Sequence, residues 1–441
     1  MFSINKWRDG ERWTNWSGKE NAHPNEYILP KSIADIQKIV KKAISFNQTI
    51  RVTGAGHSFS PVAKPEQIAI SLHEMRGLIS INLQKQEATF YAGTYLHEIG
   101  PVLEAYHYAL SNMGDIQEQT LAGVISTGTH GTGVSLGSFS SMVVKWGFVN
   151  GLGEYIEHER GDDDLSKALH VSVGLLGILV TVTIKIVPIY NLHYESKKAN
   201  LLDAIPKFSH SIRTHRHVEW YYFPGSETIQ IKQMNEAPYA PKSAQKRKLD
   251  EIKVSAVENG LFYGISELTK MKPSLAKITA KISALGISNI EKNDVSYTVF
   301  PSPRNVKFTE TEHAIPIERF EEAMEEIHWT FVRSKLNVHF PIECRTTCGE
   351  NGLLSPTLGR ESAYIAFHMY KGMNEVFYFN WVQETMKKYD SRPHWGKVNW
   401  YDKEDIYTLY PEAFKFNRIR EEQDPYGVFM TDYFKRVFKP H

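Results

Sequence analysis

The chain has 441 residues, enough for two large domains, and its formal net charge is +1 from 51 basic and 50 acidic residues. This balance argues against a nucleic-acid surface and against an acidic tail, because both need a large field of one sign. Two cysteines, Cys344 and Cys348, are too few for a disulfide scaffold. No apolar run approaches the ~20 residues of a membrane span, and the first residues lack a signal-peptide profile, so we expect a cytoplasmic protein.

The first part of the chain alternates short strands with amphipathic helices. Ser32 is a suitable N-cap for a helix whose apolar positions recur every 3.6 residues up to Ile44, and a second helix is expected after Thr94. Runs of apolar and β-branched residues predict strands at 26–30, 49–53, 68–72, 87–92, 142–149 and 177–188. This alternation predicts an α/β or α+β fold, with a domain boundary near residue 190.

The rest of the chain has a different composition and weaker patterns. A polar stretch over 236–248 predicts an exposed loop, and a lysine-rich helical segment follows over about 255–284. Two strands are expected at 337–340 and 363–367. The last part of the chain, from His394 onward, is rich in aromatic and charged residues and has no clear period.

The strand at 49–53 runs into Gly54-Ala55-Gly56-His57. Successive free backbone N–H groups after a strand form a nest that binds phosphate. Position 59 is Phe59, where the Rossmann pattern needs a third glycine. The residues alone therefore leave two interpretations open, a phosphate-binding loop or a glycine turn beside a core histidine.

A second glycine-rich segment spans 123–137 and shows no helical period, so we expect a long loop. Leu121, Val124 and Ile125 favour burial, which argues against a loose surface loop. Long loops of this kind usually serve a ligand. Two glycine-rich loops in one domain would suit an extended diphosphate ligand.

Glu343 and Arg345 are two residues apart in a strand-like run, so both project from one face. An acid and a base among apolar residues are costly unless they meet each other or a ligand, so a structural ion pair is an equal alternative. Lys397, in His394-Trp395-Gly396-Lys397, supports no chemistry by its position alone. The signatures of nucleotide hydrolysis, of zinc sites and of the nucleophile elbow are absent from the sequence.

Together these four segments resemble one family, the FAD-linked oxidases of the vanillyl-alcohol-oxidase type, in the branch of sugar-1,4-lactone and alditol oxidases. The resemblance extends from Asn15-Trp16-Ser17-Gly18 to Asp424-Pro425-Tyr426-Gly427-Val428-Phe429. It implies an α+β fold with a two-part FAD-binding domain over 1–190, a substrate-binding cap domain over 191–390, and a C-terminal segment over 391–441 that returns to the flavin site.

The resemblance also implies roles for single residues. FAD would be attached covalently through His57, and Glu343, Arg345 and Lys397 would be the catalytic residues, with no metal. The residues that it places around FAD are Arg51, Thr53, Gly54, Ala55, Gly56, His57, Ser58, Phe59, Gly123, Ser126, Thr127, Gly128, His130, Gly131, Gly133, Ile178, Val180, His394 and Lys397.

The implied reaction is hydride transfer from a CH–OH group of an L-gulono-, L-galactono- or D-arabinono-1,4-lactone to flavin N5, with O2 as acceptor and H2O2 as product. An alditol oxidase, a dehydrogenase with another acceptor and a binding protein without turnover are the alternatives. Val124 stands where the alditol oxidases carry a serine, which favours lactones. Asn399 departs from the His-Trp-x-Lys-x-His pattern of many lactone oxidases.

Overall fold

Short apolar runs in the first part of the chain pair into two sheets. The computed structural model describes residues 12–240, 263–301 and 306–438, in which all elements below lie. A parallel sheet has the order β3 (Glu26–Ile28), β5 (Ile68–Ile70) and β4 (Ile50–Val52). An antiparallel sheet has the order β10 (Tyr155–Glu159), β9 (Val143–Val149), β11 (Ile178–Lys185), β7 (Glu87–Tyr91) and β6 (Leu78–Asn82). Two small ribbons pair β1 (Trp13–Thr14) with β2 (Asn21–Ala22), and β8 (Tyr108–Ala109) with β12 (Val187–Pro188).

Four helices accompany these sheets: α1 (Ile33–Ser45), α2 (Leu96–Glu104), α3 (Leu121–Thr127) and α4 (Asp164–His170). The Ser32 side chain accepts a hydrogen bond from the backbone N–H of Asp35, as an N-cap residue does. The apolar face of α1 packs into the largest hydrophobic core. The expected N-cap and helix are therefore confirmed.

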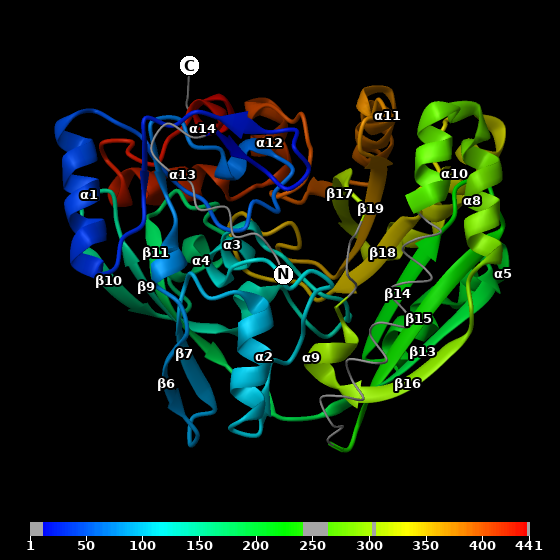
Figure 1. Ribbon diagram of the computed structural model, residues 1–441, viewed down its shortest axis with the longest axis horizontal. Coiled ribbons are helices and arrows are strands. Elements are labelled where there is room, and N and C mark those ends of the chain that lie inside the picture. The colour runs from blue at the N-terminus through cyan, green and yellow to red at the C-terminus, as the bar shows by residue number, and fades with distance from the viewer. Residues whose placement is uncertain (1–11, 241–262, 302–305, 439–441) are drawn as a thin grey trace.

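The second part of the chain forms one antiparallel sheet, on the right in Figure 1. Its strands, in spatial order, are β16 (Ile290–Val295), β13 (Asn191–Asn200), β15 (Thr228–Ala237), β14 (His217–Tyr222), β18 (Ile342–Thr347), β19 (Ser362–Tyr370), β17 (Phe308–Pro316) and β20 (Arg392–Pro393). The helices of this part are α5 (Leu201–Ala204), α6 (Phe208–Thr214), residues 263–271, α8 (Ala276–Leu285), α9 (Ser296–Val299), α10 (Phe320–Arg333) and α11 (Val376–Lys387).

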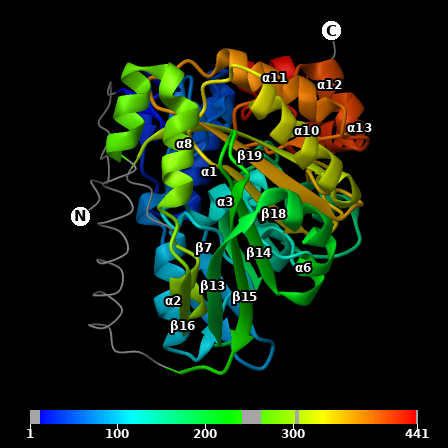
Figure 2. The same cartoon turned by 90° about the vertical axis from the view of Figure 1, so that its right-hand side faces the viewer.

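The two faces of this sheet have different chemistry because successive side chains of a strand point to opposite faces. On one face Trp220, Ile342, Cys344 and other apolar residues pack against α6, α10 and α11 in a second hydrophobic core. Figure 2 shows α6 and α10 in front of this face. The alternate residues, which include Glu343 and Arg345, point toward the first part of the chain. The predicted shared face of this acid and base is therefore confirmed.

The C-terminal residues lie with the first part of the chain. Helices α12 (Lys403–Leu409), α13 (Ala413–Gln423) and α14 (Asp432–Phe438) follow β20, and Phe416, Phe434 and Phe438 belong to the same core as α1. The backbone N–H of Ile50 in β4 donates to the carbonyl of Val428 at 2.8 Å. The chain thus crosses from the large sheet back to the parallel sheet.

The α+β class and the six strands predicted in the first part are confirmed, with ends displaced by a few residues. The strand expected at 337–340 is wrong, because β18 begins only at Ile342. The loop expected over 123–137 is wrong at its start, where Thr120 caps α3 and Leu121, Val124 and Ile125 bury one helical face. The expected helix over 255–284 lies partly outside the described residues and is interrupted near 272–275. Of the loop over 236–248, β15 takes up 236–237 and 241–248 lie outside the described residues.

The domain bounds at 190 and 390 stay a prediction. Among the helices of the described ranges, none combines the length and the apolar character needed to cross a membrane.

Candidate active site

Two clefts adjoin each other, and the second of them lies where the two parts of the chain meet. The first, which we name the glycine cleft, is lined by all residues from Ile50 to Ser58 and by parts of 71–73, 119–127 and 173–179. Six of its lining residues are glycines: Gly54, Gly56, Gly93, Gly123, Gly174 and Gly177. Much of its wall is therefore bare backbone.

The loop after β4 presents a run of free backbone donors. Within the described part of the chain, the five N–H groups from Gly54 to Ser58 have no hydrogen-bond acceptor. The loop is nevertheless fixed, since the N–H of Trp16 donates to the carbonyl of Gly56 at 2.7 Å and that of Phe59 to Gly396 at 2.6 Å. Consecutive free N–H groups in a fixed loop form a binding site for an anion such as phosphate.

Close packing explains why glycine stands in this loop. A Cβ atom on Gly54 would lie 2.6 Å from Oγ1 of Thr120, and Gly56 has a φ of +74°, which favours glycine. The loop can therefore lie directly against the start of α3. A ligand in the cleft would contact both glycine-rich segments.

Arg51 is buried at the wall of the glycine cleft. Its guanidinium donates to the carbonyls of Val62, Val173 and Gly174, so it ties three segments together. Burial lowers the pKa of Arg51 to about 9. Arg51 therefore stabilises the shape of the cleft through its hydrogen bonds to backbone carbonyls.

The second cleft, which we name the acidic cleft, is lined mainly by ionisable side chains. Its lining carboxylates are Asp115, Glu310, Glu312 and Glu343, and its lining cations are Arg345 and Lys397. Four residues line both clefts: His57, Ser58, Gln119 and Thr127. The amide loop and the charged side chains therefore meet at His57.

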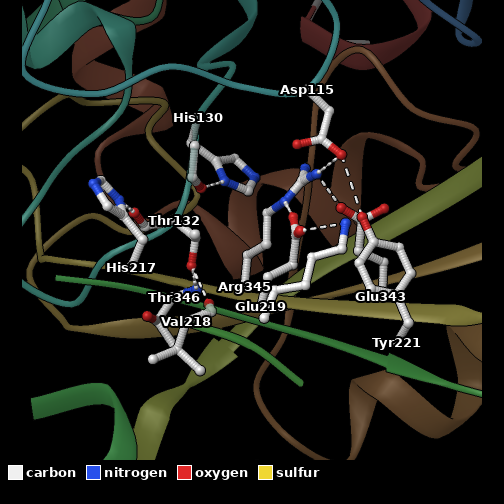
Figure 3. A network of polar contacts seen from close by, with 12 residues as sticks. Asp115, His130, Thr132, His217, Val218, Glu219, Tyr221, Glu343, Arg345 and Thr346 are labelled. Carbon is white, nitrogen blue, oxygen red and sulfur yellow. Dashed lines mark hydrogen bonds and ion pairs between the residues drawn. The ribbon is translucent and has the colours of Figure 1, made fainter. Parts of the chain in front are cut away.

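Arg345 lies at the centre of a network of acids (Figure 3). Its Nε is 2.6 Å from Oε1 of Glu219, and its Nη2 is 3.2 Å from Oδ2 of Asp115 and also contacts Glu343. Behind it, Nζ of Lys232 is 3.2 Å from Glu219. Although burial alone would lower it, the pKa of Arg345 is raised because the three carboxylates favour its charged form.

Lys397, which follows β20, has a similar environment, because it faces two acids of strand β17. Its Nζ is 2.6 Å from Oε2 of Glu310 and 3.7 Å from Oε2 of Glu312. Burial opposes its charge, but these two carboxylates raise its pKa. Lys397 is therefore an ammonium ion that donates hydrogen bonds, and it is not a proton acceptor.

Two histidines of the site, the half-buried His57 and the buried His394, are neutral. Burial lowers the pKa of His57 to about 4 and that of His394 to about 3. The ring of His57 stacks on Trp16, with 5.7 Å between centroids. A neutral imidazole in a fixed orientation is a nucleophile, which covalent attachment of a cofactor requires.

Two groups of side chains have the residue types of a metal site. These are His130 with Glu312 and His394, and Asp115 with Glu219 and Glu343. Each group has a cation beside it, since Lys397 contacts Glu312 and Arg345 contacts Glu219. These side chains supply the positive charge that a metal would otherwise bring.

The structure brings most of the residues named from the sequence to these clefts. Those that line one or both are Arg51, Thr53, Gly54, Ala55, Gly56, His57, Ser58, Gly123, Ser126, Thr127, His130, Glu343, Arg345, His394 and Lys397. Those that line neither are Phe59, Gly128, Gly131, Gly133, Ile178 and Val180. Val124 also lines neither cleft and is buried in the core, so its apolar side chain does not bear on the choice between lactone and alditol.

Apart from Glu343, sequence reasoning missed the charged residues around the two cations. Asp115 lies in the loop before α3, Glu219 and Lys232 come from β14 and β15, and Glu310 and Glu312 from β17. A usable signal existed only in β17, where glutamates alternate with threonines in Thr309-Glu310-Thr311-Glu312. The other three are single polar residues without a local pattern.

Comparisons with known proteins identify the family. Residues 24–159 match a family model described as an FAD binding domain, and residues 182–437 match one described as D-arabinono-1,4-lactone oxidase. The chain is 31% identical to an L-gulono-1,4-lactone dehydrogenase of Mycobacterium tuberculosis, over 97% of this chain and 99% of that one. It is 29% identical to the L-gulonolactone oxidase of Mus musculus, over 97% and 98% of the two chains.

The fold also matches a solved structure, the cholesterol oxidase from B. sterolicum. The TM-score is 0.80 at 16% sequence identity, and the match covers 97% of this chain and 96% of the other. This likeness concerns the fold. The extent of the family match and of the similarity to the mycobacterial protein shows that the chain belongs to the D-arabinono-1,4-lactone oxidase family of FAD-dependent oxidoreductases.

Proposed function

We propose that this protein oxidises a carbon–hydroxyl group of a sugar-1,4-lactone, with FAD in the glycine cleft and attached covalently to His57. The observation that carries the proposal is that His57 lines both clefts. A dinucleotide whose phosphates lie on the amides of 54–58 would place its ring beside the charged side chains. A polar substrate in the acidic cleft would then contact that ring.

The residues present fit FAD. The free N–H groups of Gly54 to Ser58 supply donors for a diphosphate, and a Cβ at Gly54 would close the space between the two glycine-rich segments. When bound, FAD supplies a hydride acceptor. The protein's part is to orient the substrate and to hold its protons.

Three side chains would act on the substrate. Arg345 and Lys397 are charged donors and would hydrogen-bond to the oxygen of the carbon that is oxidised. Glu343, which contacts Arg345, would orient the guanidinium and accept the hydroxyl proton. At C2 of a lactone, beside the ring carbonyl, the product would be a 2-keto lactone that tautomerises to an ene-diol.

Anaerobic reduction of the bound flavin tests the substrate class. L-gulono-, L-galactono- and D-arabinono-1,4-lactone should each be compared with xylitol and sorbitol by loss of flavin absorbance. We expect at least one lactone to bleach the flavin faster than both alditols. Bleaching by the alditols alone would show that the protein is an alditol oxidase.

We propose O2 as the electron acceptor, as the oxidase relatives suggest. The mycobacterial relative, named as a dehydrogenase, favours another acceptor. Mixing the reduced protein with air-saturated buffer separates the two. Rapid recovery of flavin absorbance together with H2O2 supports an oxidase, and slow recovery supports a dehydrogenase.

The covalent bond has its own test. Protein denatured in acid should keep flavin fluorescence on the polypeptide, and His57→Ala should release all FAD on denaturation. Ser58→Ala, a neighbour that also lines both clefts, is the matched control and should keep the flavin attached. Release of all flavin from the wild-type protein would contradict the assignment.

A further inference from the structure

Both cations of the acidic cleft are surrounded by more negative charge than they carry. Arg345 contacts three carboxylates, those of Asp115, Glu219 and Glu343. Lys397 contacts two, those of Glu310 and Glu312. By formal charge, the acidic groups around each cation therefore outnumber it.

By formal charge, with the histidines taken as neutral, the surplus persists when the whole network is considered. With Lys232, which pairs with Glu219, five carboxylates face three cations. Burial keeps His57 and His394 neutral, so these rings do not offset the surplus. His130 and His368 each have Nε2 near a carboxylate, at 3.4 Å from Glu312 and 3.6 Å from Glu310.

We infer that the acidic cleft selects uncharged substrates and rejects carboxylates, and that Glu219 and Lys232 set this selectivity by charge without touching the ligand. The inference rests on the proposed function, because it deepens the choice of substrate in the same cleft. A buried negative surplus repels an anion through the low-dielectric interior. A neutral polyol or lactone can still accept hydrogen bonds from Arg345 and Lys397.

The chemistry of lactones makes this selectivity consequential. Hydrolysis opens a 1,4-lactone to an aldonate, which keeps the hydroxyl groups and gains one negative charge. A cleft that recognised only hydroxyl groups would bind both forms. A cleft with a negative surplus accepts the closed ring and excludes the open acid.

Glu219 and Lys232 allow the charge to be changed from behind the cleft. Neither lines the acidic cleft, and Glu219 is buried. Glu219 contacts Arg345 at 2.6 Å and Lys232 at 3.2 Å, so a substitution at either alters the field at Arg345. Glu219→Gln removes one negative charge, and Lys232→Met removes one positive charge. The double variant therefore has the same formal net charge as the wild type.

The experiment compares L-gulonate with L-gulonamide, which has the same chain and no charge. Calorimetric titration of the FAD-loaded protein without oxygen gives both dissociation constants. Work near about pH 8.5 keeps unperturbed imidazoles neutral. In the wild type, L-gulonamide should bind at least about tenfold more tightly than L-gulonate, the order of effect of a nearby unit charge.

The variants should move L-gulonate in opposite directions. Glu219→Gln should strengthen its binding about tenfold, Lys232→Met should weaken it about tenfold, and the double variant should return to the wild-type value. L-gulonamide should change by less than about twofold throughout, because it carries no charge. Structural damage would instead weaken both ligands, and the double variant most.

Equal binding of the two ligands by the wild type would overturn the inference. If the wild type binds no measurable L-gulonate, the Glu219→Gln variant provides the test. If that variant also fails to bind L-gulonate more tightly, the inference is overturned. These readouts are binding constants, so they stand apart from flavin reduction. A protein that no lactone reduces, yet which shows the opposite shifts, would retain the selectivity and lose only the proposed reaction.

Discussion

The glycine cleft and the acidic cleft adjoin at His57 but are built in opposite ways. The glycine cleft uses the backbone: six glycines line it, and five consecutive N–H groups have no acceptor among the residues that the structure describes. Its buried cation, Arg51, donates to backbone carbonyls. The acidic cleft uses side chains from several loops, three strands and the C-terminal segment. Binding by backbone groups suits a ligand that stays in place through every turnover, such as a cofactor. Binding by charged side chains suits a substrate, which must be bound selectively and then released.

The largest expected effect tests whether the acidic cleft acts on chemistry alone. Arg345→Met should lower the rate of flavin reduction by lactone about 10³-fold, because it removes a charged donor at the reacting oxygen. FAD content should be unchanged, since Arg345 does not line the glycine cleft. Stopped-flow absorbance gives the rate. Arg345→Lys, which keeps the charge and loses the planar fork, should be intermediate.

If Arg345→Met lost FAD while its free energy of unfolding stayed normal, the acidic cleft would also contribute to FAD binding. That result would contradict the separate roles of the two clefts.

Arg51 gives the corresponding test in the glycine cleft. Arg51→Met leaves the carbonyls of Val62, Val173 and Gly174 without this donor. We expect a loss of about 3 kcal/mol in the free energy of unfolding, because buried acceptors without partners are costly. Urea denaturation measures it. Lys64→Met, which removes an ion pair of a far more exposed side chain, is the control and should cost less than about 1 kcal/mol.

If Arg51→Met lost as little free energy of unfolding as the control, water molecules would have replaced the guanidinium as hydrogen-bond donors to the three carbonyls.

Gly54→Ala tests the contact between the two glycine-rich segments. The new Cβ would lie 2.6 Å from Oγ1 of Thr120, so we expect about tenfold weaker FAD binding, ~1.4 kcal/mol, in a His57→Ala background. Adding Thr120→Ala removes that oxygen and should restore part of the affinity. Gly264→Ala, at a site with open space, should have no effect.

If Thr120→Ala does not rescue Gly54→Ala, the loop rather than its contact with α3 limits binding.

The contrast between the clefts also explains what the sequence could predict. Glycine runs after a β-branched strand are local patterns, so the loop at Gly54 and the strands around it were found. The alternation of Glu343 with Arg345 identified one shared face correctly. Glu219 comes to Arg345 through the pairing of β14 with β18, and Asp115 through a loop distant in the sequence. No window of the sequence contains either contact.

Two errors have physical causes of the same kind. Gly123 concealed α3, because glycine lowers helix propensity, while the cap at Thr120 and the burial of Leu121 and Ile125 outweigh that cost. The three C-terminal helices show little periodicity because they pack apolar residues against several partners in the first core. In both segments, tertiary contacts rather than local sequence patterns determine the helical structure.

The smallest expected effect concerns the seam between the second glycine-rich segment and the large sheet. His217 in β14 is fully buried, its Nδ1 lies 2.6 Å from the carbonyl of Thr132, and burial lowers its pKa to about 4. Above its ordinary value of about 6.5, both the folded and the unfolded states are neutral. As the pH falls from there toward 4, the unfolded state binds the proton first, so the free energy of unfolding decreases.

His217→Gln should therefore flatten the fall in stability between neutral pH and about pH 5.5, by about 1 kcal/mol relative to the wild type. Urea denaturation at the two pH values measures the difference, and the exposed His97→Gln should leave the slope unchanged. An unchanged slope in His217→Gln would mean that the seam opens to water before the protein unfolds. The second glycine-rich segment would then contact β14 through a seam that is mobile in the folded protein.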